Sequence, residues 1–196
     1  GNTTAERACS TLDENGNCTA YSSGVDYTYD ANGNKLTTRR CNSYDSSGNC
    51  TAYVSYGDVD YTYDANGNVL TKRNCSSFDS SGNCTAYRKN GNWDYTYDAN
   101  GNKLTDRYCS SVDSSGNCTA YNASGSYDYT YDANGNQLTS RTCSSFDSSG
   151  NCTAYSSGTD RTYDANGNDL TFRRCSSFDS SGNCTKYAGT PAEVSD

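Results

Sequence analysis

The stretch Tyr-Thr-Tyr-Asp-Ala-Asn-Gly-Asn, residues 27–34, recurs along this 196-residue chain. It returns unchanged at residues 61–68, 95–102 and 129–136, and residues 161–168 carry a variant that begins with Arg. Successive copies are 34, 34, 34 and 32 residues apart. A repeat of this length predicts an array of small supersecondary units that stack on one another.

Each copy of this stretch predicts a β-hairpin. Its Asp-x-x-Gly core favours a type I turn, with Gly in the left-handed conformation that other residues avoid. Before the turn, Tyr27 and Tyr29 alternate with Thr28, which places both rings on one face of a strand. Short hairpin loops commonly combine such a turn with a Gly bulge, so a strand should resume directly after it.

A second, weaker copy of the turn lies in the other half of each repeat. Phe78–Asn83 reads Phe-Asp-Ser-Ser-Gly-Asn and shares the pattern aromatic-Asp-x-x-Gly-Asn with the first motif. The Asp of this turn occurs eleven times, at Asp13, Asp30, Asp45, Asp64, Asp79, Asp98, Asp113, Asp132, Asp147, Asp164 and Asp179. The spacing of 15 to 19 residues suits strand, turn and strand, and no helical stripe is present.

We therefore predict an all-β fold, a rod-like tandem array of β-hairpins stapled by disulfides. Residues 1–187 are expected to form about six repeats of 32–34 residues, each with two hairpins, and to begin in the middle of a hairpin. Residues 188–196 are expected to form a C-terminal strand or tail. Single hairpins are marginal in water, so a packed seam of Tyr, Leu and Phe is expected to stabilise the stack.

The composition explains why such an array needs crosslinks. Only 32% of the residues are hydrophobic and the mean hydropathy is −0.95, which is too polar for a conventional core. Nineteen Tyr and twelve Cys compensate, because rings can be buried with their hydroxyls wet and disulfides constrain the unfolded chain. An even number of regularly spaced Cys predicts an oxidising compartment, outside the cell or on its surface.

The charge and the hydropathy pattern exclude two classes of partner. The formal net charge of −8 disfavours binding to nucleic acid, whose phosphates attract basic proteins. No apolar run approaches the 18 or so residues that a membrane-spanning helix needs. We expect neither a nucleic-acid partner nor a membrane span.

The cysteines form six pairs whose members are nine positions apart. They are Cys9 and Cys18, Cys41 and Cys50, Cys75 and Cys84, Cys109 and Cys118, Cys143 and Cys152, and Cys175 and Cys184. The gaps between pairs vary from 23 to 25 residues while the spacing within pairs is constant, which favours local disulfides.

The geometry of the loop raises an alternative pairing. With a bulged three-residue loop, Cys50 lies opposite Tyr44, so a local bond to Cys41 requires another type of turn. Bonds between neighbouring hairpins, such as Cys50 to Cys75, are the alternative. That scheme leaves Cys9 and Cys184 free to link subunits covalently.

The segment Tyr27–Thr37 resembles the tyrosine–aspartate, or RHS, repeat of bacterial surface and toxin-shell proteins. The resemblance covers one half of each repeat, five times. The other halves, such as Cys75–Tyr87, keep the turn pattern and add a Cys pair that ordinary repeats of this family lack. The resemblance implies a β-strand spiral outside the cell, in large shells or adhesive stalks. Because the chain is short and shows no shell-closing domain, we expect a slender rod rather than a hollow shell.

The triplet Asn-Cys-Thr occurs six times and fits the acceptor sequence for N-glycosylation. The six residues are Asn17, Asn49, Asn83, Asn117, Asn151 and Asn183. One interpretation is that they carry glycans. The other is that Asn follows Gly for reasons of turn geometry, as Asn68 and Asn102 do without such a triplet.

No residue pattern predicts a metal site or catalysis. Residues 30–34 lack the spacing and the distal Glu of an EF-hand calcium loop. His is absent, the Cys spacing is not that of a zinc site, and no Cys-x-x-Cys motif supports redox chemistry. An active site is normally unique, whereas each prominent Asp recurs. We therefore predict no cofactor and no enzymatic activity.

The two ends of the sequence resemble two halves of one hairpin. Gly1–Cys9 aligns with Gly33–Cys41, so the sequence opens just after a turn, and it closes on an Asp like those that precede a turn. Strand addition at exposed sheet edges then predicts head-to-tail assembly of copies. The expected contact residues are Gly1, Asn2, Val194 and Asp196. The alternative is that these residues are one stretch of a longer covalent array.

Both interpretations predict an extracellular structural protein, part of a filament, pilus-like fibre or surface stalk. The competing function is a carbohydrate-binding adhesin, or a fragment of an RHS-type shell that encloses a toxin. Tyr residues exposed in a row would favour the sugar binder, and self-assembly would favour the fibre.

Overall fold

A computed structural model describes residues 3–54 and 56–193 of the chain, which contain fourteen antiparallel β-strands. The strands are β1 (Ala5–Leu12), β2 (Cys18–Tyr29), β3 (Lys35–Tyr44), β4 (Cys50–Tyr53), β5 (Val59–Tyr63), β6 (Val69–Phe78), β7 (Cys84–Tyr87), β8 (Asn92–Tyr97), β9 (Lys103–Val112), β10 (Cys118–Tyr131), β11 (Gln137–Phe146), β12 (Cys152–Tyr163), β13 (Asp169–Phe178) and β14 (Cys184–Glu193). The predicted all-β hairpin fold is confirmed. Within the described ranges, no helix has the length and apolar character that crossing a bilayer requires.

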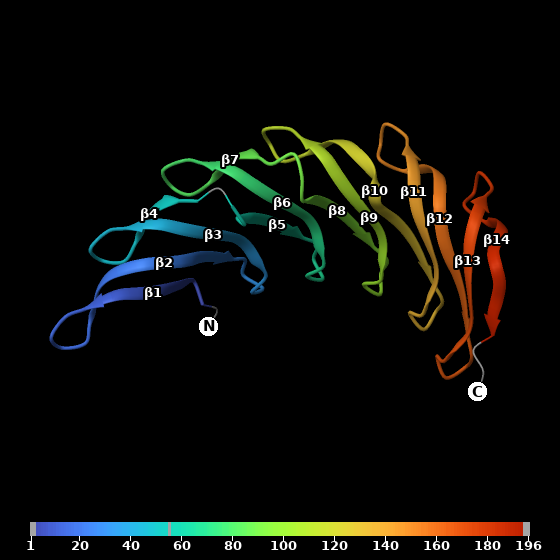
Figure 1. The fold of residues 1–196 in the computed structure, drawn as a ribbon, viewed down its shortest axis with the longest axis horizontal. Helices are drawn as coiled ribbons and strands as arrows, with labels where there is room; N and C mark the ends of the chain where they lie inside the picture. Colours follow the sequence, from blue (N-terminus) through green and yellow to red (C-terminus); the bar gives the residue numbers. More distant parts are fainter. Residues whose placement is uncertain (1–2, 55, 194–196) are drawn as a thin grey trace. The chain divides into compact units, whose positions relative to one another are not determined.

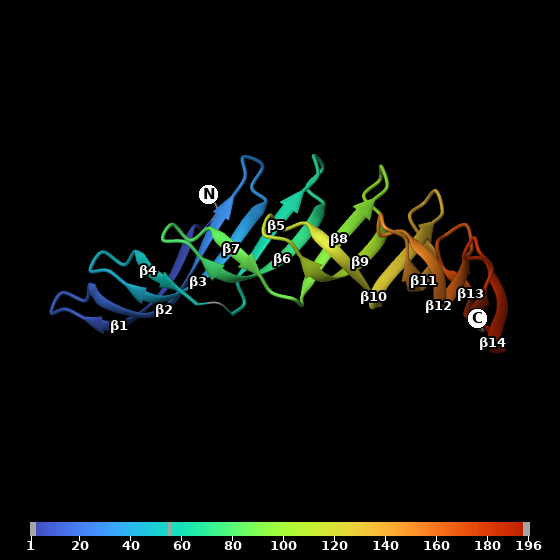
Figure 2. The ribbon, with the colours of Figure 1, turned by 90° about the horizontal axis from the view of Figure 1, so that it is seen from above.

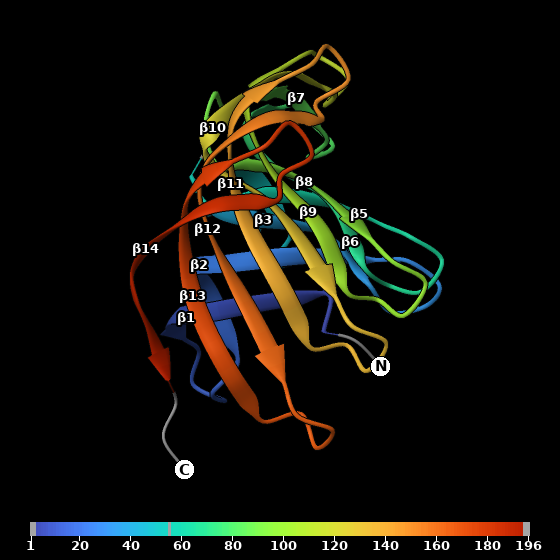
Figure 3. The same ribbon diagram turned by 90° about the vertical axis from the view of Figure 1, so that its right-hand side faces the viewer.

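The chain divides into two compact units. Unit 1 comprises Gly1–Asn92 and Ser111–Cys118, and unit 2 comprises Trp93–Ser110 and Thr119–Asp196. In unit 1, each strand pairs with the next in the order β1-β2-β3-β5-β6, with β4 added to β3 and β7 to β6 (Figure 1). In unit 2, β8 to β14 follow one another in chain order, and Figure 3 shows β11, β12 and β13 side by side.

The hairpins have two kinds of turn, at opposite ends of the long strands. The Tyr hairpins carry the Asp-Ala-Asn-Gly-Asn turns that begin at Asp30, Asp64, Asp98, Asp132 and Asp164. The Cys hairpins carry the turns between paired cysteines. Figure 2 shows two Tyr-hairpin turns of unit 1, β2 to β3 and β5 to β6, side by side at one edge. The second lies against the first, since a Cβ atom on Gly67 would come 3.3 Å from the amide oxygen of Asn34.

The turn chemistry follows the sequence prediction. Gly33 has a φ of +86° and donates its N–H to the carbonyl oxygen of Asp30, at 3.1 Å. The Asp30 carboxylate accepts the backbone N–H groups of Asn32 and Asn34, and the Asn34 side-chain amide at 2.9 Å. This last bond is the main reason that the pKa of Asp30 is lowered. The same three contacts recur at all eleven turns, so the motif specifies the hairpins locally.

The difference between 32- and 34-residue repeats lies in the strand that follows each Cys hairpin. Asp30 lies twelve positions after Cys18, whereas Asp64 lies fourteen after Cys50. Two of the three longer segments interrupt the strand, between β4 and β5 and between β7 and β8, whereas the third lies within the continuous strand β10. A buried polar side chain replaces the missing ladder bonds there. Asp58, for example, is fully buried and accepts the N–H of Arg40 at 2.7 Å.

Asn92 and Ser126 make the equivalent contacts with the backbone N–H groups of Asn74 and Tyr108, both at 2.8 Å. Each also donates a second bond to a carbonyl oxygen four residues earlier, at 2.6 Å for Asn92 and 2.7 Å for Ser126. Asp58 differs, because its Oδ2 is buried without a hydrogen-bond partner. An ionised carboxylate cannot donate a second bond, whereas a protonated one can.

We expect Asp58→Asn to stabilise the protein at pH 7 by about 1–2 kcal/mol, because an amide can both accept and donate here. Burial raises the pKa of Asp58; the Arg40 N–H and the charges of Arg39 and Arg40 oppose this, and Asp60 adds to it. Between the ordinary pKa of Asp in the unfolded chain, about 4, and its raised pKa in the folded protein, only the folded protein keeps this proton. The contribution of Asp58 to stability therefore falls as the pH rises above about 4.

Urea unfolding at pH 4 and pH 7 measures this effect. The stability difference between Asp58→Asn and the wild type should be large at pH 7 and small at pH 4. Asn92→Asp is the matched control and should lose stability at pH 7 by a similar amount. A difference that does not change with pH would contradict the account.

The most buried positions differ from the expected seam. Cys75 and Cys109 are fully buried and Cys143 nearly so, while Arg39 and Arg73 are only 5% and 4% exposed. The Tyr rings of the described region are half-buried or exposed. Within the described residues of each unit the strands form one layer, which cannot enclose large rings, so compact disulfides and paired Arg side chains fill the buried positions. Tyr and Phe rings of the expected seam do pack between repeats, as Tyr53 and Phe78 do, but they are half-buried rather than enclosed.

Candidate functional site: the junction between repeats

The disulfides join the two strands of each Cys hairpin. Cys9 bonds Cys18, Cys41 bonds Cys50, Cys75 bonds Cys84, Cys143 bonds Cys152 and Cys175 bonds Cys184, with Cα atoms 5.5–5.7 Å apart. Cys109 and Cys118 are also disulfide-bonded. The structure thus has the local pairing that the constant spacing favoured, rather than the alternative between neighbouring hairpins.

The local bond does not need another type of turn, so that step of the sequence reasoning was wrong. Tyr44 does lie opposite Cys50, as a bulged three-residue loop requires. The register then shifts twice, because Ser43 pairs with Ala52 and Cys41 pairs with Tyr53. The extra residue is Thr51 in β4 at the first shift and Asn42 in β3 at the second, and a bulge re-aims the side chains beside it. Two bulges therefore bring the sulfurs of Cys41 and Cys50 together, with Cα atoms 5.6 Å apart.

The six Asn residues of the Asn-Cys-Thr triplets have a structural role in their turns. The side-chain amide of each donates to the carboxylate of the Asp that opens the turn, at 2.9–3.1 Å. Asn34 and Asn68, which belong to no such triplet, make the same bond. Turn geometry therefore explains why Asn stands at these positions, and glycosylation stays a prediction.

Neither the expected assembly ends nor a group of potential metal ligands contributes to a site. Gly1, Asn2, Val194 and Asp196, the expected assembly ends, lie outside the described residues. One group of potential metal ligands occurs in the described region, formed by Asp128, Cys143 and Cys152. Both of its sulfurs are bonded to each other, so they are not available to a metal ion.

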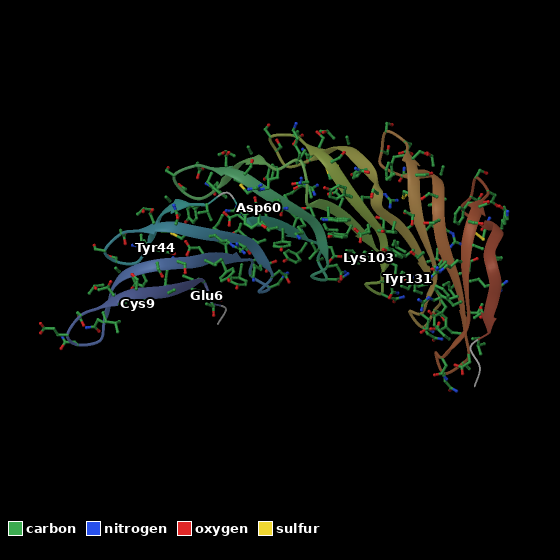
Figure 4. All side chains as sticks on the ribbon, viewed as in Figure 1. Glu6, Cys9, Tyr44, Asp60, Lys103 and Tyr131 are labelled. Carbon is green, nitrogen blue, oxygen red and sulfur yellow. A yellow bond between two sulfur atoms is a disulfide. The ribbon has the colours of Figure 1, made fainter. Side chains whose placement is uncertain are left out.

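An Arg two positions before the first Cys of each pair joins one repeat to the next, a contact that we call the junction. In unit 1, Arg39 in β3 donates from Nε to the carbonyl oxygen of Gly82, in the next Cys hairpin, at 2.8 Å. Its other nitrogens bond the carbonyl oxygen of Val59 at 3.2 Å and the carboxylate of Asp60. Figure 4 labels Asp60 in β5. It also donates to the neighbouring Thr38 carbonyl oxygen at 3.1 Å, so one planar guanidinium binds four acceptors.

The junction recurs with the same geometry. Arg7 contacts the Gly48 carbonyl at 3.0 Å and pairs with Asp26. In unit 2, Arg141 contacts the Gly182 carbonyl at 2.9 Å and pairs with Asp160. Arg73 and Arg107 reach the carbonyl oxygens of Gly116 and Gly150 at 2.6 and 2.9 Å. Each Arg thus ties its own repeat to the following Cys hairpin.

A Tyr at the end of an internal Cys-Thr-x-Tyr segment, such as Tyr53 or Tyr155, connects three successive repeats. The Tyr53 hydroxyl donates to Asp26 of the preceding repeat at 3.3 Å. Its ring packs on Phe78 of the following repeat, with centroids 5.8 Å apart, and lies over Gly82. In unit 2, Tyr155 donates to Asp128 at 2.6 Å and packs on Phe178. Burial and then this bond raise the pKa of Tyr155 to about 12.

We expect Gly82→Ala to destabilise the protein by at least about 1 kcal/mol more than Gly16→Ala. Both glycines have a left-handed φ, +80° and +82°, so Ala introduces a similar backbone strain of about 1–2 kcal/mol at each. A Cβ on Gly82 would also lie 2.8 Å from the Tyr53 ring, whereas a Cβ on Gly16 meets nothing within 4 Å. Urea unfolding of both variants measures the difference, and equal losses would contradict the proposed packing.

Sequence reasoning missed the junction. The partners of Arg39 lie 20 to 43 residues away, so no local pattern reveals them. A signal was nevertheless present, because Arg precedes the first Cys of every pair by two positions. These residues are Arg7, Arg39, Arg73, Arg107, Arg141 and Arg173. A charged residue that recurs with the period of the disulfides indicates a structural partner that recurs with it.

Comparison with known proteins relates this chain to a family of repeat proteins. The sequence model described as Teneurin YD-shell matches residues 11–112. No curated protein matches the chain. Solved structures with a similar fold include the TcdB2-TccC3-TEV crystal structure (15% identity, TM-score 0.38) and the Tc holotoxin pore of Photorhabdus luminescens (16%, 0.38). The alignments cover 85% of this chain and 9% of each of those chains.

The match extends over more than half of the chain and includes both kinds of hairpin. The disulfides and the match to this family indicate an extracellular or secreted protein. The chain belongs to the Teneurin YD-shell family of tyrosine–aspartate repeats.

Proposed function

We propose that this chain is a non-enzymatic structural segment of an extracellular fibre at the cell surface, assembled head to tail from copies of itself. The observation that carries the proposal is the junction. The same Arg contact with a Gly carbonyl recurs from Arg7 to Arg141, in unit 1 and in unit 2. Each repeat is therefore a docking surface for the next, and a contact that does not close on itself generates a linear polymer.

The charged side chains support a structural role. The eleven turn Asp residues hold the turns, and Arg39 and Arg141 with their Asp partners hold the repeats together. Groups that are fixed in repeated structural contacts are poorly suited to catalysis, which needs a unique and accessible arrangement. No enzymatic activity forms part of the proposal.

Electron microscopy of the oxidised chain, before and after reduction, tests this function. We expect uniform filaments that are lost on reduction, because the disulfides stabilise the hairpins that carry the contacts. Isolated particles in the oxidised sample at high protein concentration would contradict the proposal.

A second candidate function is a wall segment of a larger shell. The family relationship favours it, since the matching family is described as a YD-shell. In that case the chain would add its strands to those of further repeats, and the same microscopy would show hollow particles rather than filaments.

A further inference from the structure

The first and last described repeats each present one half of a junction. Arg173 stands two positions before Cys175, where Arg39 and Arg141 stand before their own Cys. Among residues 3–54 and 56–189, none accepts a hydrogen bond from its guanidinium, which lies over the Tyr187 ring, 4.8 Å from the centroid. Tyr187 is 38% exposed. We call Arg173 and Tyr187 the tail half.

The backbone register of the last repeat follows the pattern of the other junctions. The acidic partner of each junction Arg lies opposite the residue two positions before that Arg. Asp26 pairs with Ala5, Asp60 with Thr37 and Asp160 with Thr139. In the last repeat Glu193 pairs with Thr171, two positions before Arg173. An acidic residue thus occupies the expected register position.

The complementary half lies on the first Cys hairpin, and we call Leu12, Gly16 and Tyr21 the head half. Leu12 holds the position of Tyr44 and Phe78, which pack against the Tyr ring of the preceding repeat, but it is 61% exposed. The space beside Gly16 is empty, whereas a Tyr ring lies against Gly48 in the next Cys hairpin. No described residue accepts the Tyr21 hydroxyl.

We propose that a second copy of this chain docks its head half on this tail half, with the Arg173 guanidinium donating to the Gly16 carbonyl oxygen. In the docked pair, the Tyr187 ring covers Leu12 and Gly16. This contact continues the junctions already present inside the chain. It rests on the proposed head-to-tail function and names the residues that perform it.

Two variants, each blocked at one half, test the docking. Arg173→Ala removes the guanidinium of the tail half and leaves the head half intact. Leu12→Asp places a charge in the head half and leaves the tail half intact. Loss of a buried hydrogen-bonded charge should raise the concentration needed for polymerisation by about a hundredfold or more. Arg174→Ala is the matched control, because neighbouring side chains in a strand face opposite ways and Arg174 is exposed.

Size-exclusion chromatography with light scattering gives the readout. Each blocked variant should be monomeric alone, and an equimolar mixture of the two should give dimers and nothing larger, since only one productive contact remains. The dimers would also show that both variants fold. Arg174→Ala should polymerise like the wild type.

The outcomes separate this inference from the proposed function. A wild type that polymerises together with an Arg173→Ala variant that polymerises equally well would overturn the docking residues and leave the fibre standing. A mixture of blocked variants that stays monomeric would also overturn them. A wild type that is monomeric at all concentrations would overturn both proposals.

Discussion

Reduction of the disulfides is expected to unfold the oxidised chain at 25 °C. The described half-cystines Cys41, Cys75, Cys143 and Cys175 are at most 5% exposed and occupy the centre of the Cys hairpins. A disulfide that closes a loop of about ten residues stabilises a protein by about 2.7 kcal/mol through the entropy of the unfolded chain. All twelve cysteines lie within the described residues and none of them is free there, so six such bonds are lost together. Their combined effect reaches or exceeds the 5–15 kcal/mol by which most domains are stable.

Circular dichroism during titration with dithiothreitol measures this effect, and the β-sheet signal should disappear. The pairs Cys143–Cys152 and Cys9–Cys18 offer a matched comparison, because both bonds span nine residues. Replacing either pair by Ala should cost the same loop entropy. Replacing Cys143 and Cys152 should lower the free energy of unfolding by at least about 1 kcal/mol more than replacing Cys9 and Cys18, since Cys143 is 1% exposed and Cys9 is exposed. A reduced chain that keeps its β signal would show that the sheet does not depend on its crosslinks.

Arg39→Ala is expected to lower the free energy of unfolding by about 3–5 kcal/mol. Arg39 is 5% exposed, and its removal leaves the Gly82 carbonyl oxygen without this donor and the Asp60 carboxylate with only the long bond from the Tyr87 hydroxyl, at 3.5 Å. Loss of one partner of a buried ion pair has a cost of this size, because the remaining charge is uncompensated. Arg39→Lys should recover little, because an ammonium group is a compact charge and cannot reach at once the separate acceptors that the wider planar guanidinium bonds.

Arg40→Ala is the matched control for Arg39→Ala. Arg40 is the next residue in β3, is exposed, and contributes a cation–π contact with Tyr56 at 5.9 Å. Its loss should cost less than about 1 kcal/mol. Urea unfolding of the three variants gives the comparison. Similar losses for Arg39→Ala and Arg40→Ala would mean that the junction does not stabilise the stack.

The sequence predicts those parts of this structure that are decided locally. Asp30, Gly33 and Asn34 form their turn from contacts within five residues, so the motif alone predicts the hairpin. The constant Cys spacing favoured the local disulfides for the same reason. The two bulges that bring Cys41 to Cys50 were not predicted, because Asn42 and Thr51 carry no signal for them.

The junction and the buried polar groups depend on distant pairings. Arg39 and Gly82 are 43 residues apart, and they meet only when two repeats are stacked. Asp58 lies in an irregular segment, and its burial follows from the hydrogen bond that the Arg40 N–H requires there. Such contacts follow from the register between repeats, which a pattern of turns does not specify.

The most direct test of the central claim is cryo-electron microscopy of the assembled chain at a resolution that shows side chains. The account predicts linear filaments in which Arg173 of one copy contacts the Gly16 carbonyl oxygen of the next, with the geometry of Arg141 and Gly182. Filaments held by lateral contacts that leave Arg173 and Leu12 in solvent would contradict it, as would particles of a single chain.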